Sequence, residues 1–159
     1  MNIFITSPDP YKCAAYLDDK RVNKMLLETG QILSTVLRMY GQTDEGLYQA
    51  THSKHPCVVW AAETPKHFVW LYHHFIGLAE EYYQRSGFKT HKTFAQLNPI
   101  FQQYMRSNQI AYYIWEKELE FCNCSAYKDA ADIFIAYQLT LADKWETDKI
   151  TPRWNGVSK

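Results

Sequence analysis

The sequence lacks an apolar run long enough to cross a bilayer, a paired CxxC motif, and an excess of charge of either sign. A membrane-spanning helix needs about 20 consecutive apolar residues, and the N-terminus lacks the apolar core of a signal peptide. We therefore expect a cytoplasmic protein with no membrane partner. The 17 Lys and Arg balance 17 Asp and Glu, whereas non-specific nucleic-acid binders usually carry a basic excess. Any contact with DNA or a nucleotide must come from a local patch.

The four cysteines, Cys13, Cys57, Cys122 and Cys124, show no spacing typical of a metal site. One residue separates Cys122 from Cys124, which is too close for an ordinary zinc knuckle. The HxxH sequence at 52–55 lies in an expected loop, and no carboxylate follows it at ligand spacing on a helix. We therefore expect reduced thiols, no metal and no cofactor.

What the 159 residues do contain is a high share of packing side chains, 47% hydrophobic and 16% aromatic. This length suits one well-buried domain. No alternating strand of convincing length is present, and no repeat of about 20–50 residues stands out. The sequence predicts an all-α fold, a compact single-domain multi-helix bundle over residues 1–159, in which the polar tail at 145–159 packs back on the body.

The bundle is expected to form around a long N-terminal helix, Leu17–Tyr40, which Asp18 or Asp19 can cap. Its apolar residues recur at helical spacing and predict one buried face; they are Val22, Met25, Leu26, Ile32, Leu33, Val36, Leu37 and Tyr40. Arg21, Lys24 and Glu28 lie off this stripe at spacings of three and four, so they project from one neighbouring surface.

The second core helix is expected at Pro65–Gln84, after Thr64 as N-cap and before the glycine at 87. Its predicted buried face consists of Phe68, Leu71, Tyr72, Phe75, Leu78, Ala79 and Tyr82, and its other side is more polar. Shorter helices are predicted at 11–17, 57–62, 90–96, 99–105 and 109–121. A last long helix is predicted from a cap at Asp129 to about Trp145.

Glu28 and Lys24 have two interpretations. A solvated ion pair at i,i+4 contributes only a few tenths of a kcal/mol to helix stability. A half-buried carboxylate can instead act as a general acid or base, or stabilise a cationic transition state. Spacing alone does not choose between them.

Two further groups suit a phosphate or a base. The loop with Thr51 and His55, followed by Trp60, combines hydroxyl, imidazole and aromatic groups, although surface histidines without a role are equally common. The turn with Arg85, His91 and Lys92 has a local positive excess typical of an anion site. Each group also has a structural explanation without a ligand. The basic turn could be a helix C-terminus that the helix dipole favours, and Trp60 could belong to the core.

The order of Asp19, Arg21 and Glu28, then the loop Tyr48–Pro56, then EEYYQRSGF at 80–88, resembles the pyrimidine-dimer DNA glycosylase (endonuclease V) family of phages and bacteria. The chain looks closest to small phage-encoded members. These share THxxHPCxxW, a WL…EYxxR-G…HK pattern, an aspartate-then-AY helix and a Pro-x-Trp tail, here at 51–60, 70–92, 132–137 and 152–154.

The resemblance implies a compact all-α DNA-repair enzyme that flips a pyrimidine nucleotide out of a damaged duplex. Such a glycosylase and lyase cleaves the N-glycosidic bond with its N-terminal amine as nucleophile, and Glu28 would be its carboxylate. The family's nucleophile is exposed by removal of the initiator methionine, which needs a small second residue. Asn2 is not small, so Met1 is expected to be retained. The attacking amine is then either that of Met1 or absent, and Lys24, one turn from Glu28, becomes an alternative imine-forming amine if burial lowers its pKa.

Two other function classes stay open. One is a transferase or hydrolase that acts on modified pyrimidines or free nucleotides of phage, which the neutral net charge and a retained methionine favour. The other is a non-catalytic protein that sequesters a nucleotide in an aromatic, cation-lined pocket. The location of the Met1 amine relative to Glu28 is the observation that separates these hypotheses best.

Overall fold

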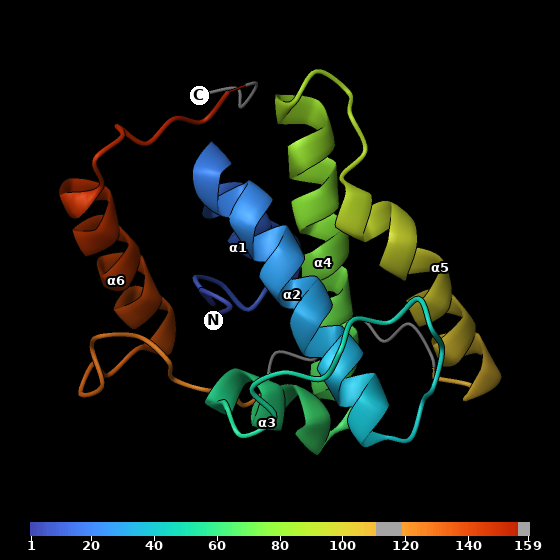
Figure 1. Ribbon diagram of the computed structural model, residues 1–159. Coiled ribbons are helices and arrows are strands. Elements are labelled where there is room, and N and C mark those ends of the chain that lie inside the picture. The colour runs from blue at the N-terminus through green and yellow to red at the C-terminus, as the bar shows by residue number, and fades with distance from the viewer. Residues whose placement is uncertain (111–118, 156–159) are drawn as a thin grey trace.

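The computed structural model describes residues 1–110 and 119–155, which form six helices and no strand. The helices are α1 (Pro10–Tyr16), α2 (Asp19–Met39), α3 (Pro56–Glu63), α4 (Pro65–Arg85), α5 (Lys92–Ser107) and α6 (Ile133–Thr147) (Figure 1). The predicted all-α fold is confirmed. Most of the helix predicted at 109–121 lies outside the described residues, and the described ends of that range are not helical.

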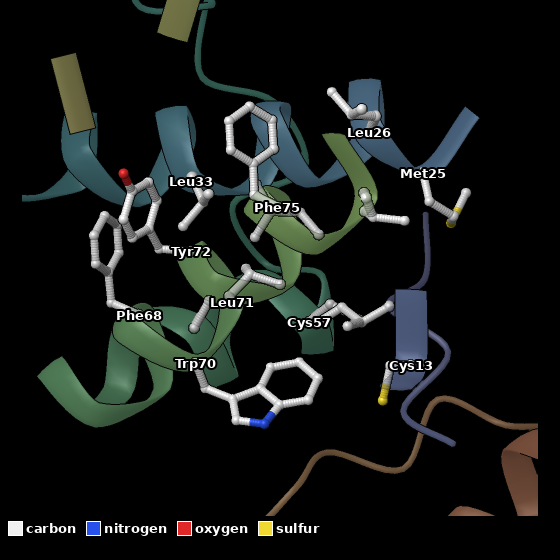
Figure 2. Close-up of a cluster of buried hydrophobic side chains, with 14 of the residues drawn as sticks. Cys13, Met25, Leu26, Leu33, Cys57, Phe68, Trp70, Leu71, Tyr72 and Phe75 are labelled. Atoms are coloured by element: carbon white, nitrogen blue, oxygen red, sulfur yellow. The ribbon is translucent and has the colours of Figure 1, made fainter. Parts of the chain in front are cut away.

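The core lies where α2 and α4 pack against each other (Figures 1 and 2). The predicted stripe of α2 is buried, except that Tyr40 at the helix end is 43% exposed, and the predicted face of α4 is buried except for the half-buried Tyr82. Gly30 on α2 admits α5, because a Cβ there would lie 2.7 Å from Thr93 Cγ2 and 2.9 Å from Leu97 Cδ1. A larger residue at position 30 would push α5 away.

The middle of the other side of α4 is also buried, which its polar composition did not indicate. Trp70 and His74 have no exposed surface. Helix α1 and the turn before it pack against this part of α4. The indole Nε1 of Trp70 donates to the carbonyl of Pro8 at 2.8 Å, and His74 Nδ1 lies 3.0 Å from the carbonyl of Pro10. Burial lowers the pKa of His74 to about 4, so this histidine is neutral in the folded protein at pH 7.

Two sequence predictions about helix boundaries were wrong. Residues 92–107 form one helix with Pro99 inside it rather than two helices, since Leu97, Phe101 and Met105 share one buried face whose packing offsets the hydrogen bond that Pro99 cannot donate. The last helix is capped by Asp132, not Asp129: Asp132 Oδ1 accepts hydrogen bonds from the backbone N–H groups of Phe134 and Ile135.

Helix α6 lies apart from the other helices at the left of Figure 1, and the N-terminal segment runs between α6 and α2. The tail beyond α6 returns to the body, where the carbonyl of Arg153 accepts from the Asp19 N–H at 2.9 Å and Trp154 Nε1 donates to the carbonyl of Tyr16. Among the described residues, no helix combines the length and apolar character that crossing a membrane requires.

Candidate active site

A cleft of about 370 Å³ opens where the N-terminal segment, α2 and α6 meet. That volume lies in the range of small-molecule sites. It is lined by Met1, Asn2, Phe4, Lys20, Arg21, Lys24, Met25, Glu28, Lys144, Thr147 and Asp148. Of the residues singled out in the sequence, Met1, Arg21, Lys24 and Glu28 therefore share one site.

The N-terminal amine and Glu28 face each other in this cleft. The Met1 nitrogen lies 3.9 Å from Glu28 Oε2, and the Glu28 side chain is 17% exposed. This distance is that of an ion pair and is longer than a hydrogen bond. Lys24 Nζ lies 3.6 Å from the other carboxylate oxygen, but its side chain is 64% exposed. The burial that would make Lys24 the better amine is therefore absent.

Asn2 directs the N-terminus toward Glu28. Its Oδ1 accepts hydrogen bonds from the backbone N–H groups of Ile3 and Phe4 at 2.7 and 3.2 Å, and its Nδ2 donates to the carbonyl of Cys124. Phe4 follows with φ of 55°, a left-handed conformation that costs a non-glycine residue about 1–3 kcal/mol. Burial of Ile3 and Ile5 on either side holds this bend, which brings the amine into the cleft.

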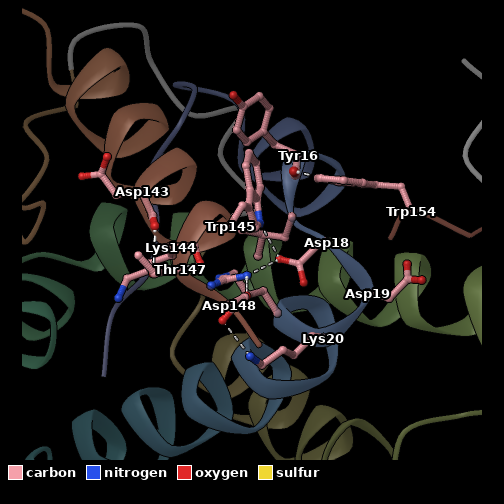
Figure 3. Close-up of polar contacts among 12 residues, drawn as sticks. Tyr16, Asp18, Asp19, Lys20, Asp143, Lys144, Trp145, Thr147, Asp148 and Trp154 are labelled. Carbon is pink, nitrogen blue, oxygen red and sulfur yellow. Dashed lines mark hydrogen bonds and ion pairs between the residues drawn. The ribbon is translucent and has the colours of Figure 1, made fainter. Parts of the chain in front are cut away.

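At the edge of the cleft, Asp18 and Lys20 at the start of α2 lie close to Asp148 at the end of α6 (Figure 3), and the link between them also involves Arg21. Its Nη1 donates to Asp18 Oδ1 and to Asp148 Oδ2, both at 2.8 Å, and its side chain is 8% exposed. Lys20 Nζ donates to the other oxygen of Asp148 at 2.9 Å. Hydrogen bonds from Lys20 and Arg21 lower the pKa of Asp148. Asp18 occupies the N-cap position of α2 without capping it, because its carboxylate accepts from Arg21 and from Trp145 Nε1.

The rim of the cleft is positive although the whole chain is neutral. Among the lining residues, the cationic groups outnumber the two carboxylates, which belong to Glu28 and Asp148. The cationic groups are Lys20, Arg21, Lys24, Lys144 and the N-terminal amine. Lys20 was not among the site residues predicted from the sequence. Its position four residues before Lys24 places both on the same face of α2, and this spacing could have identified it. Lys144 and Asp148 carried no such signal, because only the fold brings α6 to α2.

The structure does not bring Arg85, His91 or Lys92 into this cleft. The Arg85 side chain is 4% exposed, and its guanidinium donates to the carbonyls of Leu17 and Ala15 at 2.6 and 3.1 Å, which ties the C-terminus of α1 to α4. His91 is the N-cap of α5, where its Nδ1 accepts from a backbone N–H, and Lys92 is the first residue of that helix. Phosphate binding by these three residues stays a prediction.

Thr51, His55 and Trp60 also lie away from the lining of the cleft. Thr51 N–H donates to Thr35 Oγ1 at 3.2 Å, and His55 is the N-cap of α3. The Trp60 ring is stacked on the ring of His67 at 4.6 Å, and its Nε1 donates to the carbonyl of Glu120. At 5% exposure, Trp60 contributes to the core in this structure, and its stacking on an extruded base stays untested.

The sequence matches a family model described as pyrimidine dimer DNA glycosylase over residues 1–96. The chain belongs to this family. The resemblance inferred from the motifs is thereby confirmed, and membership places the chain in a family of enzymes whose substrate is DNA. No curated protein and no solved structure matches the chain.

The family match covers only part of the cleft. It includes Met1, Lys24 and Glu28 and extends through α1 to α4 into the first turn of α5. Lys144 and Asp148, on and just after α6, lie beyond it. The amine and the carboxylate thus come from the matched region, and one side of the basic rim does not.

Proposed function

We propose that this chain is a DNA glycosylase and lyase that excises a damaged pyrimidine from DNA by means of the Met1 amine and the Glu28 carboxylate. The observation that supports this most is their 3.9 Å separation in a cleft with a lysine-rich rim. Family membership supplies the reaction class. The substrate is a pyrimidine nucleotide flipped out of the duplex, because its C1′ atom must reach a cleft of single-nucleotide dimensions.

The Met1 amine is the nucleophile in this proposal. After it loses one proton, its nitrogen attacks C1′, the bond from C1′ to the base nitrogen breaks, and the bonding electrons leave with the base, which takes up a proton. Loss of a second proton from the nitrogen, followed by breakage of the C1′–O4′ bond with protonation of O4′, gives a protonated imine between Met1 and C1′. Removal of a C2′ proton then breaks the C3′–O3′ bond and cleaves the strand.

Glu28 serves as the proton acceptor and as the counter-charge. General-base catalysis requires the carboxylate to reach the amine proton. At 3.9 Å, a small movement of either group gives a direct hydrogen bond, and one bridging water gives an indirect one. The carboxylate also faces the positive charge that develops on the sugar as the base departs, and its low exposure strengthens that attraction. Lys20, Lys24 and Lys144 supply cations for the flanking phosphates.

The test uses a duplex that contains one ultraviolet-induced pyrimidine dimer, with and without borohydride. Wild type is expected to cleave the strand and to form a reduced covalent adduct. Glu28→Gln should lower the cleavage rate by about 100-fold or more, within the range of positioned acid–base groups. Glu45→Gln, at an exposed loop carboxylate, is the matched control and should retain the wild-type rate.

Two variants assign the amine. Lys24→Arg keeps the charge but removes the alternative primary amine, so trapping should persist. An N-terminal extension moves the amine out of the cleft and should abolish trapping, whereas the same tag at the C-terminus should not. Equal rates for wild type and Glu28→Gln, or loss of trapping in Lys24→Arg alone, would contradict the proposal. Turnover of free nucleotides with no cleavage of the duplex would support the transferase or hydrolase class in its place.

A further inference from the structure

Cys57 meets Cys122 and Cys124, from a distant part of the sequence, at one end of α3. The sulfurs of Cys57, Cys122 and Cys124 all lie within 4.8 Å of one another, and Cys57 Sγ lies 3.4 Å from Cys124 Sγ across 67 residues of sequence. The fourth cysteine, Cys13, is elsewhere, on α1. The cluster involves none of the residues proposed for catalysis.

We propose that Cys57, Cys122 and Cys124 bind one Zn²⁺ ion as thiolates, with water in the fourth position. Zinc–thiolate bonds of about 2.3 Å in tetrahedral geometry separate neighbouring sulfurs by about 3.8 Å. The sulfur separations, 3.4 Å between Cys57 and Cys124 and no more than 4.8 Å for any pair, are close to that value, so small side-chain rotations suffice to form the site. The spacing of Cys122 and Cys124 gave no hint of zinc because the third sulfur comes from another part of the chain.

The surroundings suit a cation that binds thiolates. Cys57 lies in the first turn of α3, where the helix dipole favours a negative sulfur. Cys122 and Cys124 are half-buried, and Cys122 also lines an open cleft of about 470 Å³ beside Trp60 and Glu120. An ion can enter from this side, and a water can complete its coordination.

The proposed ion would organise the enzyme's N-terminus and α6. The carbonyl of Cys124 accepts the hydrogen bond from Asn2 Nδ2, one residue from the Met1 amine. The hydroxyl of Tyr137 on α6 donates to the carbonyl of Cys122 and accepts from the N–H of Cys124, both at 2.8 Å. Holding residues 122–124 against α3 therefore positions the segments that form two sides of the catalytic cleft.

The first experiment titrates the full-length, reduced and chelator-treated protein with Co²⁺ under anaerobic conditions. We expect one equivalent to bind with thiolate-to-cobalt charge transfer and the visible bands of tetrahedral cobalt, and Zn²⁺ to displace it. Zinc should also raise the thermal midpoint of unfolding, because a ligand that binds the folded state stabilises it. These readouts do not require activity, so they stand or fall separately from the proposed glycosylase reaction.

Cys122→Ser and Cys57→Ser should each weaken cobalt binding at least about tenfold and lose the zinc-dependent rise in the unfolding midpoint. Cys13→Ala is the matched control, since it removes a buried thiol outside the cluster, and it should bind as wild type does. If Cys57→Ser does not fold, Cys122→Ser at a half-buried position carries the test. Folded, fully reduced wild type that binds no Co²⁺, or cobalt bands unchanged in Cys122→Ser, would overturn the proposal.

Discussion

The α2–α4 core and helix α6 are held in different ways. In the core, whole apolar faces are buried, as with Leu33 and Phe75, which have no exposed surface. Helix α6 buries little more than Ala136, Tyr137 and Leu141, and its position depends on individual long-range hydrogen bonds. Gln138 Nε2 donates to the Thr6 carbonyl at 3.1 Å, and Trp145 Nε1 donates to Asp18 at 2.8 Å.

This difference separates a region that amphipathic patterns predict from one that they do not. The family match ends at residue 96, after both core helices, and α6 lies beyond it. Yet α6 and the residue after it contribute Lys144 and Asp148 to the cleft. The region covered by the family match supplies the amine and the carboxylate, and α6 with the residue after it completes the rim.

The largest effect is expected from a cavity in the core. Phe75→Ala should lower the free energy of unfolding by about 3–5 kcal/mol, because the ring is fully buried and its removal leaves unfilled space. Urea denaturation measures this loss. Ile135→Ala on α6, where the side chain is 51% exposed, should change stability by less than about 0.5 kcal/mol. Comparable losses for the two variants would contradict the contrast between the regions.

The next largest expected effect is a loss of folding stability at acidic pH, which is caused by His74 in the core. The unfolded chain takes up a proton near pH 6.5, whereas burial holds the pKa of the folded His74 at about 4. Stability from the neutral histidine is therefore fully present above pH 6.5 and is lost as the pH falls to 4, by about 3 kcal/mol in total. Denaturation measured across this window should show a flatter pH dependence for His74→Gln than for wild type. Equal slopes for His74→Gln and wild type across this window would contradict the role of His74.

A smaller effect is expected where α6 attaches to residues 122–124. Tyr137→Phe removes a hydroxyl that makes two hydrogen bonds and should cost about 1–3 kcal/mol. Tyr72→Phe is the counterpart in the core and removes the hydrogen bond to Asn98 Oδ1, so its cost should be about 1 kcal/mol. Amide hydrogen exchange measures the two regions separately. Tyr137→Phe should speed the exchange of backbone amides in α6 but not in α2.

The sequence was most informative where one face of a helix is apolar. The buried stripe of α2 and the predicted buried face of α4 follow from spacing alone, and Pro56 and Pro65 mark helix starts that the structure confirms. Trp70 and His74 were harder, because whether a polar-looking face is buried depends on which element covers it. Pro99 predicted a helix boundary that the structure does not have, because the packing of α5 along one buried face outweighs the backbone hydrogen bond that proline cannot donate.

By itself, then, the sequence determined that this chain is helical, that α2 and α4 form its core, and that its motifs are those of the pyrimidine dimer DNA glycosylase family. These properties depend on local periodicity and residue order, which the linear chain already contains. Only the tertiary structure decided that the Met1 amine faces Glu28, that Lys144 joins the rim, and that three cysteines cluster. Such contacts join residues up to more than a hundred positions apart, and no local pattern specifies which distant polar groups folding brings together.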